Sequence, residues 1–473
     1  MNLRFLLNEA GIPSTQTDTE TEITAVTDCL DRVSPGALFV CIDGERTRGS
    51  SLIDAAAARG AVRFLTEGPT DRPDAIAVEN VRLAYSRLAA AFHGRPDKKL
   101  KLIGVTGTNG KTTTARYISY LLGGSGVKCA YIGTEGVEID GVLSPTGYTT
   151  PGADLFFGAL AKAVNAGCKA LAAEVSSMAL SQYRVHGAAF RVGVLTNVGT
   201  DHLDYHRTPR ALAEAKSRLA TLSDTMLVNG DDAYAPLFQE AHRGRTCLYS
   251  TRAILSDFSA RNIRQQGFAT SFLYLNGKAA VPLKLPTPGV FAVYNALAAL
   301  AACELAGADP ERLFPLVETL PNPPGRAQLL QKNGVTVCVD FAHTPEALSA
   351  MLTALRAATA GRLIAVFGAG GDRDGTKRPI MGRVASSLAD EVILTSDNPR
   401  HEDPDAIIAA IAGGARGRKN VFREPDRGRA IALALKKARP GDTVLIAGKG
   451  SETTQTVGDR KLPFSDLETV RAL

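Results

Sequence analysis

The sequence predicts an α/β protein of three domains, and three observations carry that prediction. The chain has 473 residues, about three times the length of a typical domain. A Gly-rich loop stands between an apolar strand and an amphipathic helix near residue 107. From residue 335 onward, short apolar segments alternate with helical ones, the pattern of a doubly wound parallel sheet. We expect domains over residues 1–97, 98–324 and 325–473.

Composition narrows the class of protein. An apolar fraction of 45% with 22% charged residues is typical of globular proteins. The net charge of +6 is too small to predict a nucleic-acid partner. The seven cysteines are scattered without a Cys-x-x-Cys pair, which argues against disulfides and zinc. No signal-peptide core and no apolar stretch of about 18 residues is found, so we expect a cytoplasmic protein without membrane insertion.

The N-terminal domain is predicted to be a small α/β unit. Residues 37–42 and 61–65 have the apolar pattern of strands, with a helix over 52–59 between them. The polar run 97–99 and the Pro-rich turn 321–325 are interpreted as linkers. Ligands divided among three domains meet only when those domains approach, which suggests domain closure.

The central domain begins with a strand over residues 102–105, followed by the loop 106–111. Helical spacing of apolar residues then continues to Gly123 and Gly124, which we expect to close the helix. A second, long and largely apolar helix is predicted over residues 294–306. The Gly-rich loop therefore lies at a helix N-terminus, where backbone N–H groups face an anion.

The loop has the Gly-Lys-Thr ending of a phosphate-binding loop. Lys111 is expected to reach the outer phosphates of ATP, and the Thr112 hydroxyl to bind Mg²⁺. Val105 occupies the place of the first glycine in the strict motif, and a plain Gly-rich turn is the alternative. The loop predicts a central P-loop ATPase domain that binds ATP through Gly107, Thr108, Asn109, Gly110, Lys111, Thr112 and Thr113.

The C-terminal domain is predicted to be a Rossmann-like, doubly wound sheet. Its expected strands are residues 335–341, 363–367, 391–395 and 443–447, and its expected helices are 345–357, 380–388, 404–412 and 427–438. In such a sheet ligands collect at the C-terminal ends of the strands, so the polar residues after each strand are the candidate site.

Residues 107–112, Gly-Thr-Asn-Gly-Lys-Thr, begin a wider resemblance. The chain resembles the Mur ligases of peptidoglycan synthesis, most closely the MurE type, which adds the third amino acid. The blocks that carry the resemblance are 148–151 (Tyr-Thr-Thr-Pro), 174–177 (Glu-Val-Ser-Ser), Asn197 with 201–206 (Asp-His-Leu-Asp-Tyr-His), 340–345 (Asp-Phe-Ala-His-Thr-Pro), 370–374 (Gly-Gly-Asp-Arg-Asp) and 397–400 (Asp-Asn-Pro-Arg).

The resemblance implies a three-domain Mur ligase architecture and an ATP- and Mg²⁺-dependent amide ligase. Its substrates would be UDP-N-acetylmuramoyl-L-alanyl-D-glutamate (UDP-MurNAc-L-Ala-D-Glu) and a diamino acid, joined through an acyl phosphate. The UDP-MurNAc dipeptide would bind the N-terminal domain and the diamino acid the C-terminal domain. A monomer is expected.

The resemblance also implies the catalytic and metal-binding residues. Glu174 ends an apolar strand, so its carboxylate is placed to bind Mg²⁺, although a helix cap is the alternative. His202 matches a second metal ligand, and Thr112 completes the set. Lys216 matches the lysine that the family carbamylates, which turns an ammonium into an anionic metal ligand. From its own sequence context alone, Lys216 would be a solvated helix residue.

Two further groups of residues follow from the resemblance. For the nucleotide, Asn295, Arg326 and Asp340 match positions that contact the base, ribose or phosphates. For the UDP-MurNAc dipeptide, the matching residues are Thr27, Cys29, Thr149, Thr150, Ser177, Gln182 and Arg184. Hydroxyls and an arginine suit a ligand rich in phosphate and carboxylate oxygens, but helix capping explains Ser177 and Thr150 equally well.

The acceptor amino acid is predicted from residues 397–400. Arg400 offers a planar fork for a carboxylate, and meso-diaminopimelate carries a distal carboxylate that lysine lacks. The motif therefore favours diaminopimelate, although a surface turn is the alternative. The resemblance assigns Arg373, Asp397, Asn398, Pro399, Arg400, Gly448 and Glu452 to this ligand, with Glu452 holding the distal ammonium.

Some positions depart from the family pattern, and rival functions stay open. Cys29, Ala292, Gln328 and Ser451 stand where Ser, Asn, Glu and His are usual. A ligase that adds L-lysine or ornithine, or one of folate-polyglutamate type, is the rival among enzymes. A P-loop ATPase that switches partners is the rival from another class.

Overall fold

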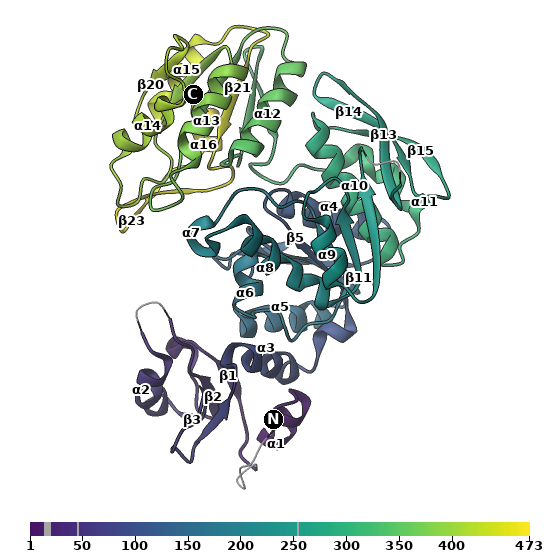
Figure 1. Ribbon diagram of the computed structural model, residues 1–473, viewed down its shortest axis with the longest axis vertical. Helices are drawn as coiled ribbons and strands as arrows, with labels where there is room; N and C mark the ends of the chain where they lie inside the picture. Colours follow the sequence, from purple (N-terminus) through teal and green to yellow (C-terminus); the bar gives the residue numbers. More distant parts are fainter. Residues whose placement is uncertain (14–19, 45–46, 253–254) are drawn as a thin grey trace.

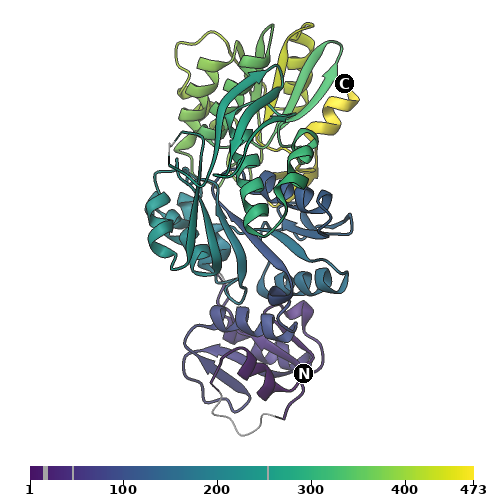
Figure 2. The same cartoon turned by 90° about the vertical axis from the view of Figure 1, so that its right-hand side faces the viewer.

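The computed structural model describes residues 1–13, 20–44, 47–252 and 255–473. Three sheets follow one another along the long axis of the molecule, with the N-terminal sheet at one end and the C-terminal sheet at the other (Figures 1 and 2). The predicted α/β class and three-domain organisation are confirmed. In the described part of the chain, no helix combines the length and hydropathy required to span a bilayer.

The N-terminal sheet has four parallel strands in sequence order. They are β1 (Ala25–Thr27), β2 (Ala37–Val40), β3 (Ala61–Glu67) and β4 (Ala75–Val78), with helices α1 (Leu3–Glu9), α2 (Ile53–Ala58) and α3 (Val81–Phe92). The two predicted strands and the helix between them are confirmed. Sequence reasoning missed β1 and β4, which are too short to show a clear apolar pattern.

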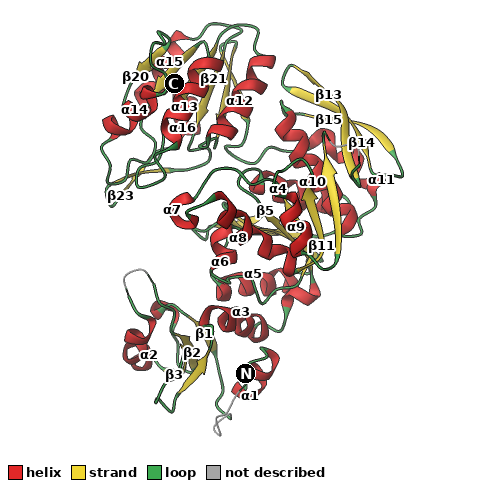
Figure 3. Ribbon diagram, viewed as in Figure 1, coloured by secondary structure: helices red, strands yellow, loops and turns green. Residues whose placement is uncertain are grey.

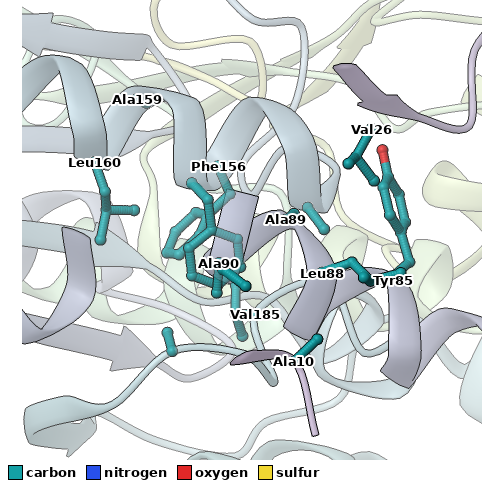
Figure 4. Packing of buried hydrophobic residues seen from close by; sticks show 14 of the residues in the cluster. Ala10, Val26, Tyr85, Leu88, Ala89, Ala90, Phe156, Ala159, Leu160 and Val185 are labelled. Carbon is teal, nitrogen blue, oxygen red and sulfur yellow. The ribbon is translucent and has the colours of Figure 1, made fainter. Parts of the chain in front are cut away.

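The first linker is packed rather than flexible. Helix α3 lies against α5 (Ala153–Asn165), and Figure 4 shows Ala90 of α3 and Phe156 of α5 in one apolar cluster. The run expected to be a polar hinge is a 3₁₀ turn, Pro96–Lys99. Asp97 in this turn is buried and accepts hydrogen bonds from Arg95 at 2.6 Å and from the Ala189 N–H at 3.1 Å. Through its contact with Ala189, Asp97 ties this turn to the central domain, where the sequence predicted a polar hinge.

The central sheet has eleven strands in the order β15-β14-β13-β12-β11-β10-β5-β9-β6-β7-β8. Its strands are β5 (Lys101–Thr106), β6 (Cys129–Gly133), β7 (Gly136–Ile139), β8 (Val142–Ser144), β9 (Ala170–Glu174), β10 (Phe190–Leu195), β11 (Ser223–Asn229), β12 (Arg245–Ser250), β13 (Phe258–Gln266), β14 (Ala269–Leu275) and β15 (Ala280–Leu285). Strands β6 and β9 through β12 are parallel to β5, whereas both outer ends of the sheet continue as antiparallel hairpins. Sequence reasoning missed the hairpins.

Two helices pack against the strands that carry the Gly-rich loop. Helix α4 (Lys111–Gly124) starts at the loop, and it includes Gly123 and Gly124 instead of ending before them. Helix α10 (Val290–Leu305) begins four residues before the expected start and is buried beside α4. The other helices of this domain are α6 (Ser177–Ser181), α7 (Leu203–His206), α8 (Pro209–Thr221), α9 (Ala235–Ala241) and α11 (Pro310–Leu313).

The C-terminal sheet has six strands in the order β16-β17-β21-β18-β19-β20, all parallel except β16. The elements of the C-terminal domain are β16 (Gln328–Lys332), β17 (Val335–Asp340), α12 (Pro345–Ala358), β18 (Leu363–Phe367), α13 (Lys377–Leu388), β19 (Glu391–Leu394), α14 (Pro404–Gly413), β20 (Val421–Arg423), α15 (Arg427–Lys437), β21 (Thr443–Ala447), β22 (Thr454–Val457), β23 (Arg460–Pro463) and α16 (Asp466–Ala472). Strands β22 and β23 form a separate antiparallel pair. The expected strands and helices are confirmed.

Helices cover both faces of this sheet (Figure 3). The apolar residues of α12, α13 and α14 share one core, and those of α15 and α16 share the other. Sequence reasoning missed β16, β20 and the β22–β23 hairpin, whose residues are mostly half-buried or exposed. The doubly wound arrangement directs the ends of β17, β18, β19 and β21 to one edge, where polar loops gather.

Candidate active site

The Gly-rich loop forms the predicted phosphate cradle between β5 and α4. Lys111 is inside it, and its Nζ donates to the carbonyl oxygens of Gly107 at 2.8 Å and Thr108 at 2.9 Å. Gly110 has a φ of +85°, and a Cβ there would lie 2.4 Å from Oδ1 of Asn295. The loop therefore needs glycine at this position both for its backbone turn and for the approach of Asn295.

Asn197, two residues after the end of the neighbouring strand β10, fixes the shape of the loop. Its side-chain oxygen accepts the Asn109 N–H at 2.9 Å, and its backbone carbonyl accepts the Thr108 N–H at 2.8 Å. Its amide group donates in return to the Asn109 carbonyl at 3.0 Å. Three hydrogen bonds to two consecutive residues hold the loop backbone in one conformation.

A cavity of about 490 Å³ opens beside the loop, between the central and C-terminal domains. Its lining includes six of the residues predicted to bind ATP, namely Asn109, Gly110, Thr113, Asn295, Arg326 and Asp340. Arg326 lies over the Phe341 ring at 4.3 Å, and Asp340 accepts backbone N–H groups from Ala327 and Ala342, each at 2.7 Å. Burial raises the pKa of Asp340.

Aromatic residues that sequence reasoning missed also line this cavity. They are Tyr117, Tyr249, Phe291, Tyr294 and Phe341. Apolar and aromatic walls with a few convergent polar groups are typical of sites that bind a flat, ring-containing ligand. The cavity and the phosphate loop together fit a nucleotide.

Glu174 lies at the end of β9, directly beside the loop. One carboxylate oxygen accepts hydrogen bonds from the Tyr131 hydroxyl at 2.6 Å and the Thr134 N–H at 2.9 Å. The other accepts from the hydroxyls of Thr112 at 2.9 Å and Thr134 at 3.1 Å. The expected projection of Glu174 towards the loop is confirmed, and Tyr131 is a partner that the sequence did not predict.

The oxygen atoms around Thr112 and Glu174 fit a hard cation. Among the residues that the structure describes, no three His, Cys, Asp or Glu side chains converge as a metal cluster. Mg²⁺ commonly takes one or two carboxylates and completes its shell with phosphate oxygens and waters. The carboxylate and hydroxyl beside the phosphate loop are the ligand set that this arrangement requires.

Lys216 is buried in α8, with a relative exposure of 2%. Burial, reinforced by the nearby charge of Lys111, lowers the pKa of Lys216 well below its usual value. The expectation from local sequence alone, a solvated helix residue, was wrong, because α8 packs this face against the central sheet. A neutral amine at this position is a nucleophile at ordinary pH.

Asp201 joins the central domain to the C-terminal domain. Its carboxylate lies 3.5 Å from Nε2 of His202, 3.5 Å from Nε2 of His343 and 3.7 Å from Nζ of Lys377. Burial opposes its ionisation, but the His343 hydrogen bond and the surrounding cations outweigh burial and lower the pKa of Asp201. His202, the residue expected to bind a second metal, is therefore paired with this carboxylate.

A cavity of about 170 Å³ lies at the same domain junction. The predicted acceptor residues that line it are Arg373, Asp397, Asn398, Arg400, Gly448 and Glu452. Pro399 lies outside this lining, with its carbonyl facing Gly371. Arg400 donates to the Gly371 carbonyl at 2.5 Å, and Arg373 reaches Asp204 of the central domain at 3.5 Å.

Lys449, which sequence reasoning missed, lies behind two residues that line this pocket, Asn398 and Glu452. It is fully buried, and its Nζ donates to Glu452 at 2.6 Å, to Asn398 at 3.1 Å and to the Thr454 carbonyl at 2.8 Å. Asn398 also donates to Glu452 at 2.8 Å. The sequence signal that could have identified Lys449 is its position directly after β21, within a Gly-Lys-Gly segment. Glu452 is thus already paired with a cation inside the protein.

A third cavity, of about 560 Å³, lies between the N-terminal and central domains. Cys29, Gln182 and Arg184 line it as expected. The lining residues that were not predicted include Arg32, Arg59, Arg82 and Tyr148, together with Asp28 and Asp31, which pair with Arg32 and Arg59. A cavity edged by several arginines fits an anionic ligand such as a diphosphate.

The other residues predicted for this ligand lie elsewhere. Thr150 is buried and donates to the Glu174 carbonyl at 2.8 Å, and Thr149 bonds to Thr134 at 3.1 Å. Ser177 pairs with His206 at 2.9 Å, and Thr27 donates to Asp154 at 3.4 Å. Thr149, Thr150 and Ser177 are thus grouped near Glu174 rather than in the arginine-lined cavity.

The residues that depart from the family pattern occupy these same sites. Cys29 lines the arginine-edged cavity, and Ala292 lines the nucleotide-shaped one. The side-chain oxygen of Gln328 accepts the Gly325 N–H at 2.8 Å and so stabilises the Pro-rich turn. Ser451 is exposed beside Glu452.

The pKa of Asp201 gives a testable dependence of stability on pH. A carboxylate with a lowered folded-state pKa contributes stability above its unfolded pKa of about 3.8, and this contribution is lost as pH falls towards the folded value. We expect Asp201→Asn to lower the free energy of unfolding by about 1–3 kcal/mol near pH 5 and by less near pH 3. Urea unfolding of both proteins measures the difference. A penalty that grows on acidification below pH 4 would contradict this assignment.

Comparison with known protein families covers most of the chain. Residues 22–94 match the family described as "Mur ligase family, catalytic domain", residues 105–303 the "Mur ligase middle domain", and residues 325–450 the "Mur ligase, glutamate ligase domain". Two relatives are named UDP-N-acetylmuramoyl-L-alanyl-D-glutamate–2,6-diaminopimelate ligase. That of Synechococcus elongatus is 39% identical, covering 100% of this chain and 98% of the relative. That of Aquifex aeolicus is 37% identical, covering 93% and 91%.

Solved structures give the same result. A structure of UDP-N-acetylmuramoyl-L-alanyl-D-glutamate–2,6-diaminopimelate ligase superimposes with a TM-score of 0.74 at 32% identity, covering 100% of this chain and 98% of the other. The MurF ligase of Thermotoga maritima in complex with ADP has a TM-score of 0.65 at 21% identity, with 90% and 94% covered. The second likeness shows a shared fold.

Proposed function

The chain belongs to the Mur ligase family, and on that premise we propose that it adds meso-2,6-diaminopimelate to UDP-MurNAc-L-Ala-D-Glu with cleavage of ATP to ADP and phosphate. The observation that carries this proposal is the meeting of three ligand sites in one chain. The phosphate loop and Glu174 lie between an arginine-edged cavity for a nucleotide sugar and a small polar pocket for an amino acid.

The first step transfers a phosphoryl group. A carboxylate oxygen of the D-glutamyl residue attacks the γ-phosphorus of ATP, the bond to ADP breaks, and an acyl phosphate forms. Lys111 and the backbone N–H groups of the loop stabilise the charge on the transferring phosphoryl oxygens. Mg²⁺, when bound by Thr112 and Glu174, supplies further charge neutralisation on those oxygens.

Lys216 supports a second metal site in this proposal. Burial lowers the pKa of its amine, and the reaction with CO₂ requires the neutral form of that amine. Addition of the amine to CO₂, with loss of one proton, gives a carbamate that carries negative charge. Such a group would offset the charge of Lys111 and, with His202, offer ligands to a cation.

The second step forms the amide. The α-amine of diaminopimelate attacks the acyl carbon, loses a proton, and expels phosphate. Arg400 is placed to hold the distal carboxylate in a forked pair of hydrogen bonds, because the Gly371 carbonyl already fixes its guanidinium. Glu452 accepts Lys449 and Asn398 on one oxygen, which leaves its other oxygen for the distal ammonium.

The same proposal covers the domain boundaries, the metabolic role, the cellular compartment and the oligomeric state. We place the domain boundaries near residues 97 and 324, the metabolic role in the supply of peptidoglycan precursors, and the reaction in the cytoplasm, where ATP and UDP-linked precursors occur. We also propose that the protein is a monomer. Because the first junction is packed by Asp97 and the α3–α5 contact, the Pro-rich turn is the better candidate for a hinge.

The reaction itself is tested by phosphate release. We expect release only when ATP and UDP-MurNAc-L-Ala-D-Glu are both present with meso-diaminopimelate, and not with lysine or ornithine. Lys111→Ala should lower the rate by about 100-fold or more, whereas Lys278→Ala, at an exposed hairpin position, should not change it. Release stimulated by lysine or ornithine would identify the rival ligase. Release that ignores the UDP-MurNAc dipeptide would identify a P-loop ATPase.

Arg400 tests the choice of acceptor. A lysine side chain keeps the charge but not the planar fork, so Arg400→Lys should raise the KM for meso-diaminopimelate by about 10-fold or more. The exposed substitution Arg312→Lys is the matched control. Steady-state kinetics with the acceptor varied measures both. An unchanged KM in Arg400→Lys would exclude the forked contact.

Lys216 is tested by nuclear magnetic resonance with ¹³C-bicarbonate. We expect a carbamate carbon signal in the unmodified protein and in Lys278→Ala, and its loss in Lys216→Ala. Acidification should also remove the signal, because a protonated amine does not hold CO₂. A carbamate signal that persists in Lys216→Ala would place the modification on another lysine.

A further inference from the structure

Tyr131 fixes one oxygen of the Glu174 carboxylate. It lies in β6, which pairs with β9 so that Tyr131 is opposite Ala172, two residues before Glu174. Its hydroxyl donates to Oε1 at 2.6 Å, and the Thr134 N–H donates to the same oxygen at 2.9 Å. The other oxygen, Oε2, faces the Thr112 hydroxyl at 2.9 Å. The carboxylate is therefore held with one oxygen directed away from the loop and one towards it.

Arg116 holds the Tyr131 ring from the opposite side. The guanidinium lies 3.8 Å from the ring centroid, within the range of a cation–π contact. Two carboxylates anchor it, Glu135 at 2.6 Å and Glu138 at 2.6 Å. Arg116 is in α4, one helical turn after Thr112, so the helix that begins at the phosphate loop also positions the ring behind Glu174.

Gly133 leaves the space in which these two side chains meet. A Cβ at this position would lie 2.1 Å from the Tyr131 hydroxyl and 2.2 Å from Oε1 of Glu174. Neither distance is compatible with the observed contact. Tyr131 is itself fully buried, so it has no space to retreat. The close approach of the phenol to the carboxylate thus depends on the absence of a side chain at Gly133.

From this geometry we propose that Tyr131, held by Arg116, is a positioning residue that presents Oε2 of Glu174 to the cation bound with the nucleotide. The inference rests on the proposed function only in assigning Mg²⁺ to Glu174. A hydrogen-bond partner behind a metal ligand fixes its orientation, and loss of such partners commonly weakens metal binding by about 10–100-fold. Tyr131 is not among the residues that line the three cavities described above.

The test measures metal binding directly, without turnover. Mn²⁺ is titrated into protein saturated with ADP, and the free ion is followed by electron paramagnetic resonance. Tyr131→Phe should raise the Kd for Mn²⁺ by about 10-fold or more, while metal-free ADP binds as tightly as it does to the unmodified protein. Gly133→Ala, which displaces the same contact by another route, should have the same two effects.

Tyr274→Phe is the matched control. Tyr274 is also a fully buried tyrosine whose hydroxyl donates to a glutamate, Glu304, but it lies in the β14 hairpin away from the three cavities. We expect its Mn²⁺ affinity to equal that of the unmodified protein. An unchanged Mn²⁺ Kd in Tyr131→Phe, or an equal loss of metal-free ADP binding, would overturn the inference.

These outcomes are independent of the ligase reaction. If the unmodified protein failed to join the UDP-MurNAc dipeptide and diaminopimelate, the proposed function would be wrong. The Kd for Mn²⁺ in the presence of ADP, compared with the Kd for metal-free ADP, would still decide the role of Tyr131. Conversely, normal metal binding in Tyr131→Phe would leave the ligase assignment intact.

Discussion

The order β10-β5-β9 at the centre of the large sheet is the constraint on which the site depends. These three parallel strands are in register at their ends, with Leu195 opposite Thr106 and Val105 opposite Glu174. Whatever follows each strand must therefore lie at one edge of the sheet. The phosphate loop follows β5, Glu174 ends β9, and the segment containing Asn197 and Asp201 follows β10. Residues separated by up to about a hundred positions are brought together by backbone pairing alone.

The same edge concentrates buried charge. Lys216 is buried and Lys111 is half-buried, and desolvation lowers the pKa of each. Desolvated ammonium groups are costly unless anions lie nearby. Glu174 and Asp201 provide part of that compensation, and a triphosphate would provide the rest. An electropositive recess with low solvent access is thus suited to hold phosphates before any ligand-specific contact is considered.

The cavity lined by Arg373, Asp397 and Arg400 is built differently, on a rigid floor. The fully buried pair Arg427–Asp466, with a contact of 2.7 Å, places the Arg427 guanidinium against the carbonyls of Ser396 and Ala447. Those carbonyls immediately precede Asp397 and Gly448. The pair therefore fixes the ends of β19 and β21, while the more exposed Arg373 contacts Asp204 across the domain junction. The pocket thus has a firm floor and a rim divided between the two domains.

The sequence by itself determined the α/β class, the strand–loop–helix around Lys111, the alternation of the C-terminal domain and the family blocks, because these depend on local periodicity and short motifs. The short edge strands and the antiparallel hairpins were not predicted, because so few residues carry too weak an apolar pattern. Only the tertiary structure decided that Asp97 ties the first linker to the central domain, that Lys216 is buried, and that the Lys449 ammonium is paired with the Glu452 carboxylate. Each of these depends on which faces of distant elements pack together, and local sequence does not encode burial or the identity of a partner far along the chain.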